Sequence, residues 1–154
     1  MVSAWIADKR LSDRERERRR EERHEKLAMR RADFQRETLL ALQAASQKLM
    51  RVAAAMHHKD RMAFRKTGAW QKQQLGEDLS NEHLRQTTET KLLASRVLDN
   101  ETREVANEFR KLASTVSICG SEGDAEERLN AAANMQGILI ERIGQLVREL
   151  DEPR

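Results

Sequence analysis

The sequence predicts an all-α protein: an elongated, coiled-coil-like antiparallel bundle of three long helices with an N-terminal helical extension. Charged residues make up 36% of the 154 residues and aromatic residues only 3%, so a core has to be built from aliphatic side chains and Met. The chain has one Pro and six Gly, which leaves few positions where a helix must stop. Apolar residues also recur at steps of three and four, the spacing of helices packed lengthwise.

The first helix is expected to run without a break from about Asp8 to Thr67. Gly68 should end it, because Gly readily adopts the left-handed conformation that closes a helix. The apolar stripe of this helix has steps of three and four from Leu42 onward and is wide enough to contact two neighbours. It consists of Leu27, Phe34, Leu42, Ala45, Leu49, Val52 and Met56, widened by Leu39, Met50 and Ala53.

A second helix is expected from the N-cap Ser80 to about residue 118, after a loop over residues 68–79. Asp99 and Asn100 could cap a new helix and split this one, but the unbroken phase of the stripe across them favours one continuous helix. The stripe consists of Leu84, Thr88, Lys91, Ser95, Leu98, Thr102, Val105, Phe109, Leu112 and Val116.

The last helix is expected to follow a turn over residues 119–123, with Asp124 and Glu127 as a start that resembles a capping box. Residues 151–153 should close it. Its stripe consists of Leu129, Ala132, Gln136, Leu139, Ile143, Leu146 and Leu150. The chain is thus expected to divide into a basic helical arm over residues 1–31, which overshoots the other helices, and a helical bundle domain over residues 32–154.

The arm is rich in charge: residues 9–31 contain eleven Lys or Arg and six Asp or Glu, against eighteen and twenty in the rest of the chain. Glu15 with Arg19 and Glu22 with Lys26 have the spacing of stabilising ion pairs, which favours a solvated, self-paired helix. Such interleaved carboxylates argue against nucleic acid, whose phosphates need accessible cations. The residues of the arm that are candidates for contact with a surface or partner are Trp5, Arg14, Arg16, Arg18, Arg19, Arg20 and Arg23.

Trp5 and Ile6 stand just before Lys9 and Arg10, the order found where a membrane segment ends and cytoplasmic positive charge begins. From here the chain resembles short, uncharacterised bacterial proteins, common in actinobacteria, in which a membrane helix leads into a Trp, an Asp-Arg-Arg-like turn and an Arg/Glu-rich helix. The resemblance extends to RRADFQRETLLALQ (30–43), AMHHKDRMAFRKTGAW (55–70) and ERIGQLVRELDE (141–152). It implies no particular activity. Met1 falls after the place where that membrane helix would lie.

His57 and His58 are candidate metal ligands, but adjacent histidines point about 100° apart on a helix and cannot share a metal. One is expected at the edge of the bundle under the 68–79 loop and the other in water. Trp70 is a further candidate for partner contact, although folding back to cap the end of the bundle is favoured. Cys119 lacks the cationic or helix N-terminal setting that activates a thiolate.

These features predict a non-enzymatic module without metal or cofactor that binds a protein partner or associates with itself, for instance as a homodimer. The alternative is a binder of anionic surfaces that uses the basic arm at the inner face of a membrane, with nucleic acid less favoured. A single Cys, no visible signal peptide and no apolar run near the roughly 18 residues of a membrane span predict a location in the cytoplasm or at that inner face.

Overall fold

The computed structural model describes residues 2–70 and 76–152, apart from the side chain of Ser3. The described elements are α1 (Val2–Thr67), α2 (Glu77–Arg96), α3 (Asn100–Ser114), the 3-10 turn η1 (Val116–Ile118) and α4 (Glu122–Asp151). The chain divides into two compact units, which we name the N-terminal unit (Met1–Phe34) and the bundle unit (Gln35–Arg154).

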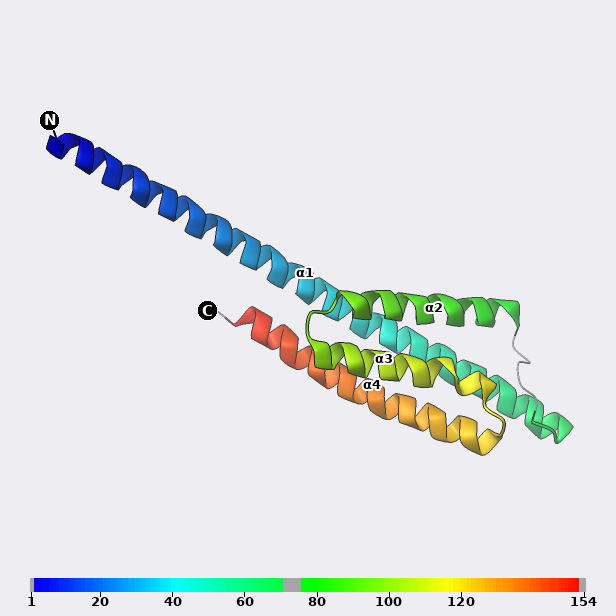
Figure 1. Cartoon of the computed structure of the whole chain (residues 1–154). Coiled ribbons are helices and arrows are strands. Elements are labelled where there is room, and N and C mark those ends of the chain that lie inside the picture. Colours follow the sequence, from blue (N-terminus) through cyan, green and yellow to red (C-terminus); the bar gives the residue numbers. More distant parts are fainter. Residues whose placement is uncertain (1, 71–75, 153–154) are drawn as a thin grey trace. The chain divides into compact units, whose positions relative to one another are not determined.

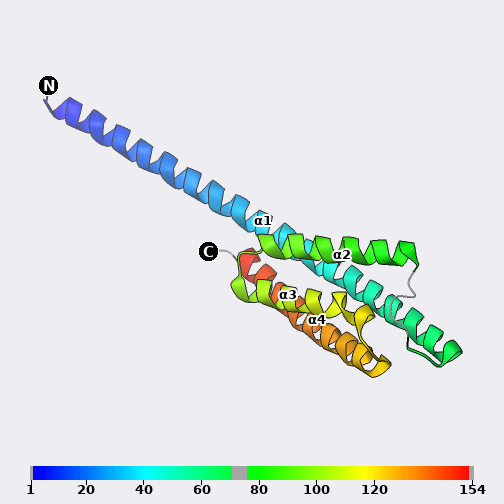
Figure 2. The same cartoon turned by 45° about the vertical axis from the view of Figure 1, so that its right-hand side comes forward.

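The bundle unit contains the second half of α1 together with α2, α3 and α4. These helices run alternately in opposite directions, and α3 lies beside α4 (Figure 1; Figure 2). Because the described residues form helices and no strand, the prediction of an all-α helical bundle with a long N-terminal helix is confirmed. Two ion pairs join α1 to α4, one between Arg36 and Asp151 and one between Arg61 and Glu122.

Helix α1 is continuous because residues 2–67 contain neither Gly nor Pro. It starts at Val2, six residues before the expected start. The predicted end is confirmed: Gly68 has a φ of 70°, and its N–H donates to the carbonyl of Phe64 at 2.8 Å. Arg65 and Lys66 in the last turn are favourably placed at the negative end of the helix dipole.

The predicted continuous helix over residues 80–118 is wrong, and the alternative split at Asp99 is confirmed. The carboxylate of Asp99 accepts hydrogen bonds from the N–H of Thr102 at 2.9 Å and from its hydroxyl at 2.6 Å, which starts α3. Gln35 of α1 holds the end of α2: its amide donates to the carbonyl of Arg96 and accepts from the N–H of Leu98, both at 2.9 Å. The break is therefore fixed by side chains that satisfy the backbone on both sides of it.

The start of α2 also differs from the prediction. The helix begins at Glu77, with Gly76 rather than Ser80 at the N-cap position and no side-chain cap bond. Glu77 and Asp78 in the first turn interact favourably with the positive end of the helix dipole.

Helix α2 buries a different stripe from the predicted one. Leu84 is 66% exposed and Leu98 is 60% exposed, and the polar members of the predicted stripe between them are exposed as well. The buried residues are Gln86, Thr90, Leu93 and Ala94. Beyond the break the prediction holds, because the stripe of α3 is buried or half-buried from Thr102 to Leu112.

Helix α4 begins at Glu122, two residues earlier than expected. Its N-cap is Ser121, whose hydroxyl accepts from the N–H of Asp124 at 3.1 Å, so the predicted cap at Asp124 is wrong. The predicted stripe from Leu129 to Leu150 is buried or half-buried throughout. Pro153, expected to close the helix, lies outside the described residues.

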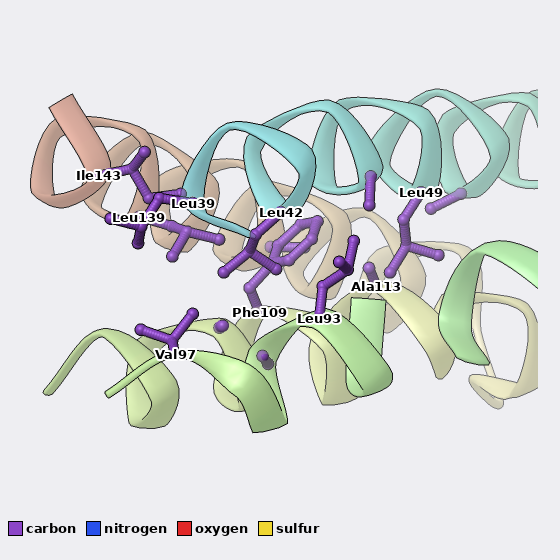
Figure 3. Packing of buried hydrophobic residues seen from close by; sticks show 14 residues of the cluster. Leu39, Leu42, Leu49, Leu93, Val97, Phe109, Ala113, Leu139 and Ile143 are labelled. Atoms are coloured by element: carbon purple, nitrogen blue, oxygen red, sulfur yellow. The ribbon is translucent and has the colours of Figure 1, made fainter. Parts of the chain in front are cut away.

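The core of the bundle unit is aliphatic around one aromatic ring. Phe109 is fully buried and lies close to Leu42 of α1, with side chains of all four helices around it (Figure 3). The predicted stripe of α1 is buried from Leu39 to Met56, apart from the half-buried Met50. Leu27 and Phe34, the first two residues of that prediction, are 62% and 50% exposed instead.

Candidate interaction surfaces

In the N-terminal unit, every described side chain between residues 4 and 31 is exposed. Trp5 is 65% exposed, and the ammonium of Lys9 lies 5.4 Å from the centroid of its ring, a cation–π contact. The arginines do not gather on one face, because successive helical residues point about 100° apart. The exposed residues include all the candidates on the arm: Trp5, Arg14, Arg16, Arg18, Arg19, Arg20 and Arg23.

Two ion pairs follow the surface of this unit. Arg19 Nη2 lies 2.9 Å from Glu15 Oε1, as the spacing predicts, and Arg18 Nε lies 3.3 Å from Glu22 Oε1. Glu22 therefore pairs with Arg18 rather than with Lys26. Exposed pairs of this kind stabilise a helix by about 0.3–0.5 kcal/mol each and also engage cations that a polyanion would need.

The ring of Trp70 folds back onto the bundle unit, as predicted. Its indole N–H donates to the carbonyl of Cys119 at 3.0 Å, and its ring packs edge-on against Phe64 at a centroid distance of 5.9 Å. The ring also packs on a small buried cluster around Val116 and Ala125. Much of the Trp70 side chain is thus used within the chain, and only part of it is available to a partner.

His57 lies beneath Trp70, with ring centroids 6.3 Å apart, and is only 5% exposed, whereas His58 is exposed. This confirms the prediction that one histidine is covered and the other faces water. Asp60 is 3% exposed, and neither ring nitrogen of His57 nor Oδ1 of Asp60 has a hydrogen-bond partner among the described residues. Within those residues no group of three His, Cys, Asp or Glu side chains could hold a metal ion.

The surroundings of His57 keep it neutral at pH 7. Burial lowers its pKa from the ordinary 6.5 and the guanidinium of Arg61 lowers it further, while Glu126, Asp60 and Glu122 act in the opposite direction. Burial raises the pKa of Asp60 above 3.8, and His57 opposes that shift. Both pKa shifts have the direction that desolvation causes, so the burial of His57 and Asp60 lowers the stability of the fold.

The thiol of Cys119 is buried, and its Sγ lies 3.5 Å from the carbonyl oxygen of Thr115. An open groove of about 500 Å³ runs beside it, between η1 and the first turns of α4, with Asp124 and Arg128 among its lining residues. A second, more apolar groove of about 210 Å³ lies at the α2–α3 break and includes Leu98.

The first surface that stands out, which we name the outer face of α2, consists of Leu84, Thr88, Lys91, Leu92 and Ser95 of the helix together with Leu98, which lies two residues beyond its end at Arg96. It includes three exposed leucines, with Leu92 46% exposed. The spacing of this face predicts a buried stripe, but in the structure the face is exposed. The signal of a packing face was thus present, but this face has no partner among the described residues of the chain.

The second surface is the exposed side of α1 between residues 40 and 66, which sequence analysis missed. Residues 38–67 contain six Lys or Arg and one carboxylate, Asp60, which is buried. The half-buried Arg61 pairs with Glu122, and the other five cations are exposed. A count of charges by segment does not reveal this surface, because the N-terminal unit contains more cations in total.

Among the described residues, no helix combines the length and apolar character needed to cross a bilayer. Comparison with known proteins yields no match, whether with family models, with curated proteins or with solved structures.

Proposed function

We propose that the chain is a non-enzymatic helical assembly module that associates with a second copy of itself through the outer face of α2. The observation that carries the proposal is the combination of spacing and exposure on this face. Within α2, Leu84, Thr88, Lys91 and Ser95 follow one another at steps of four, three and four, the repeat of helices packed lengthwise, and Leu98 follows just past the end of the helix. Leu84 and Leu98 are among the most exposed leucines of the bundle unit.

A second copy fits this face because the face is complementary to itself. When two α2 helices lie antiparallel about a two-fold axis near Lys91, the Leu84 end of one copy faces the Leu98 end of the other, so leucine meets leucine at both ends of the contact. Two-fold symmetry then produces each contact twice, as in most homodimers.

The polar residues of the face set the strength of the dimer. Lys91 lies near its midpoint, so the two copies of this ammonium approach each other in the antiparallel arrangement. Like charges at that position oppose association. We therefore expect a weak dimer whose population depends on protein concentration.

The test is sedimentation of the full chain over a concentration series, compared with the variant L84S/L92S/L98S. The wild type should move from monomer to dimer with rising concentration, and the triple variant should stay monomeric. Ile138→Ser is a matched control, because Ile138 is an exposed residue of α4, 52% exposed. A wild type that remains monomeric at every concentration, or a dimer that survives the triple substitution, would contradict the proposal.

A second candidate function is binding to an anionic membrane surface through the N-terminal unit. It is supported by Trp5, which is 65% exposed beside Ile6 and has the Lys9 ammonium next to its ring. Trp at the boundary between headgroups and acyl chains, followed by cations, is a common membrane-surface arrangement. The fraction of the protein that sediments with anionic vesicles should then fall on Trp5→Ala. Binding that is unchanged by Trp5→Ala would exclude this role for the N-terminal unit.

A further inference from the structure

The exposed side of α1 in the bundle unit has a charge pattern unlike that of the N-terminal unit. Its five exposed cations lie between Lys48 and Lys66, about 27 Å apart along the helix, and no exposed carboxylate of α1 lies between them. None of the five forms an ion pair in the part of the chain that the structure describes. We name this surface the basic face. Its cations are Lys48, Arg51, Lys59, Arg65 and Lys66.

The cations of the basic face lie on both sides of a line of apolar side chains. At about 100° per residue, Ala44, Ala55 and Met62 share one line along the helix, and all three are exposed. Met62 is 42% exposed. The residues that flank this line are Lys48, Lys59 and Lys66 on one side and Arg51, His58 and Arg65 on the other.

We propose that the basic face binds an anionic lipid membrane, with the helix axis parallel to the surface. The flanking lysines and arginines can extend past the helix to headgroup phosphates or carboxylates while their aliphatic stems lie along the apolar line. Met62 then enters the boundary between headgroups and acyl chains, as the apolar residues of interfacial helices do. A cluster of four to eight cations on one helix face is the pattern that anionic lipids attract.

The apolar line favours a membrane over a nucleic acid. A phosphate backbone would lie closest to the middle of the face, where Ala44, Ala55 and Met62 offer no hydrogen-bond donor. A planar surface instead accepts apolar side chains in the middle and cations at the sides. Binding to duplex DNA in place of vesicles is therefore an outcome that contradicts the proposal.

This inference does not depend on the proposed dimer, because the basic face and the outer face of α2 have no residue in common. It names the same class of partner as the second candidate function, but a different surface. Variants of the N-terminal unit and of the basic face therefore separate the two.

The experiment is co-sedimentation of the full chain with vesicles of phosphatidylcholine alone and with added phosphatidylserine, at about 0.1 M salt. K48Q/K59Q/K66Q removes three charges from the basic face. Each lysine at an anionic surface contributes roughly fivefold to affinity, so the triple variant should bind on the order of 100-fold more weakly. Met62→Ser should weaken binding several-fold with no change in charge.

Two matched variants remove the same charge elsewhere. K111Q/R128Q/R148Q alters exposed residues of α3 and α4, and R14Q/R16Q/R20Q alters the N-terminal unit. The proposal expects both to bind vesicles more tightly than the basic-face variant. It is overturned if the wild type ignores phosphatidylserine, if all three triple variants lose affinity equally, or if only the variant of the N-terminal unit does. Duplex DNA binding that requires the three lysines, without vesicle binding, also overturns it.

Discussion

The two halves of α1 have equal length and the same secondary structure, but they use their charges differently. Residues 2–34 contain eleven Lys or Arg and eight Asp or Glu, while residues 35–67 contain seven and two. In the first half cations pair with carboxylates one turn away, as Arg19 does with Glu15. In the second half an apolar stripe is buried, two cations pair with carboxylates of α4, and the other five are exposed.

This comparison shows that a dense run of charge is a poor guide to where a polyanion would bind. The first half has more arginines, yet the second has the larger excess of positive charge, five against three. What matters is the set of cations that share a face and have no carboxylate nearby. That set becomes visible only when the buried side of the helix is known.

The largest expected effect compares one leucine from each half. Leu42 is fully buried and Leu27 is 62% exposed. Leu42→Ala should lower the free energy of unfolding by about 2–5 kcal/mol, because it leaves a cavity beside Phe109. Leu27→Ala should change it by less than about 0.5 kcal/mol. Urea unfolding followed by circular dichroism measures both, and equal losses would mean that the first half also packs against a core.

Gln35 is the first residue of the bundle unit, and its substitution tests whether the boundary between the two halves of α1 lies there. Gln35→Ala leaves the carbonyl of Arg96 and the N–H of Leu98 without their partner, which should cost about 1–3 kcal/mol. Hydrogen exchange of the Leu98 amide should become faster as well. A variant as stable as the wild type would show that water replaces the glutamine at the α2–α3 break.

His57 lies on the buried side and His58 on the exposed side of the second half of α1, so substitutions at these two positions compare the two sides. Because the pKa of folded His57 lies below 6.5, the unfolded chain takes up its proton first as the pH falls. Stability contributed by neutral His57 is therefore complete above about pH 6.5 and is lost as the pH falls from there towards its lowered pKa.

His57→Gln should reduce this decline between pH 7 and 5, measured as the free energy of unfolding, with His58→Gln at the neighbouring exposed position as the control substitution. Asp60 has a raised pKa, so its contribution runs the other way: stability falls as the pH rises from 3.8 towards that raised value. A decline in stability that is the same in the wild type and in His57→Gln would assign it to other groups.

The smallest expected effect concerns the ion pairs of the first half. Glu15→Gln removes the partner of Arg19 and should change the stability of the whole chain by less than about 0.5 kcal/mol. Helicity measured by circular dichroism should fall slightly and become less sensitive to salt. A loss above about 1 kcal/mol would show that this pair belongs to a larger network.

Sequence reasoning predicted the elements governed by local chemistry. Gly68 ends α1 because only a few residues tolerate positive φ, and the stripe of α4 packs because its spacing and composition agree. It also predicted that Trp70 folds back and that only one of the two histidines is covered. Each of these depends on neighbours along the chain or on a general property of the side chain.

The predictions were wrong where residues distant in the sequence determine the structure. The stripe through Leu84 and Leu98 has the right spacing, yet α2 buries Gln86 and Thr90, whose polar character conceals them from a search for apolar periodicity. Thr90 is accommodated because its hydroxyl donates to the carbonyl of Gln86 at 2.8 Å. The break before α3 depends on Gln35, which lies more than sixty residues away along the chain.

The most direct test of the account is the removal of residues 1–31. All the described residues of the two hydrophobic clusters lie beyond position 34, so the shortened chain should unfold cooperatively with a free energy within about 0.5 kcal/mol of the full chain. A shortened chain that is unfolded, or that loses several kcal/mol, would contradict the claim that the second half of α1 with α2, α3 and α4 contains the whole fold.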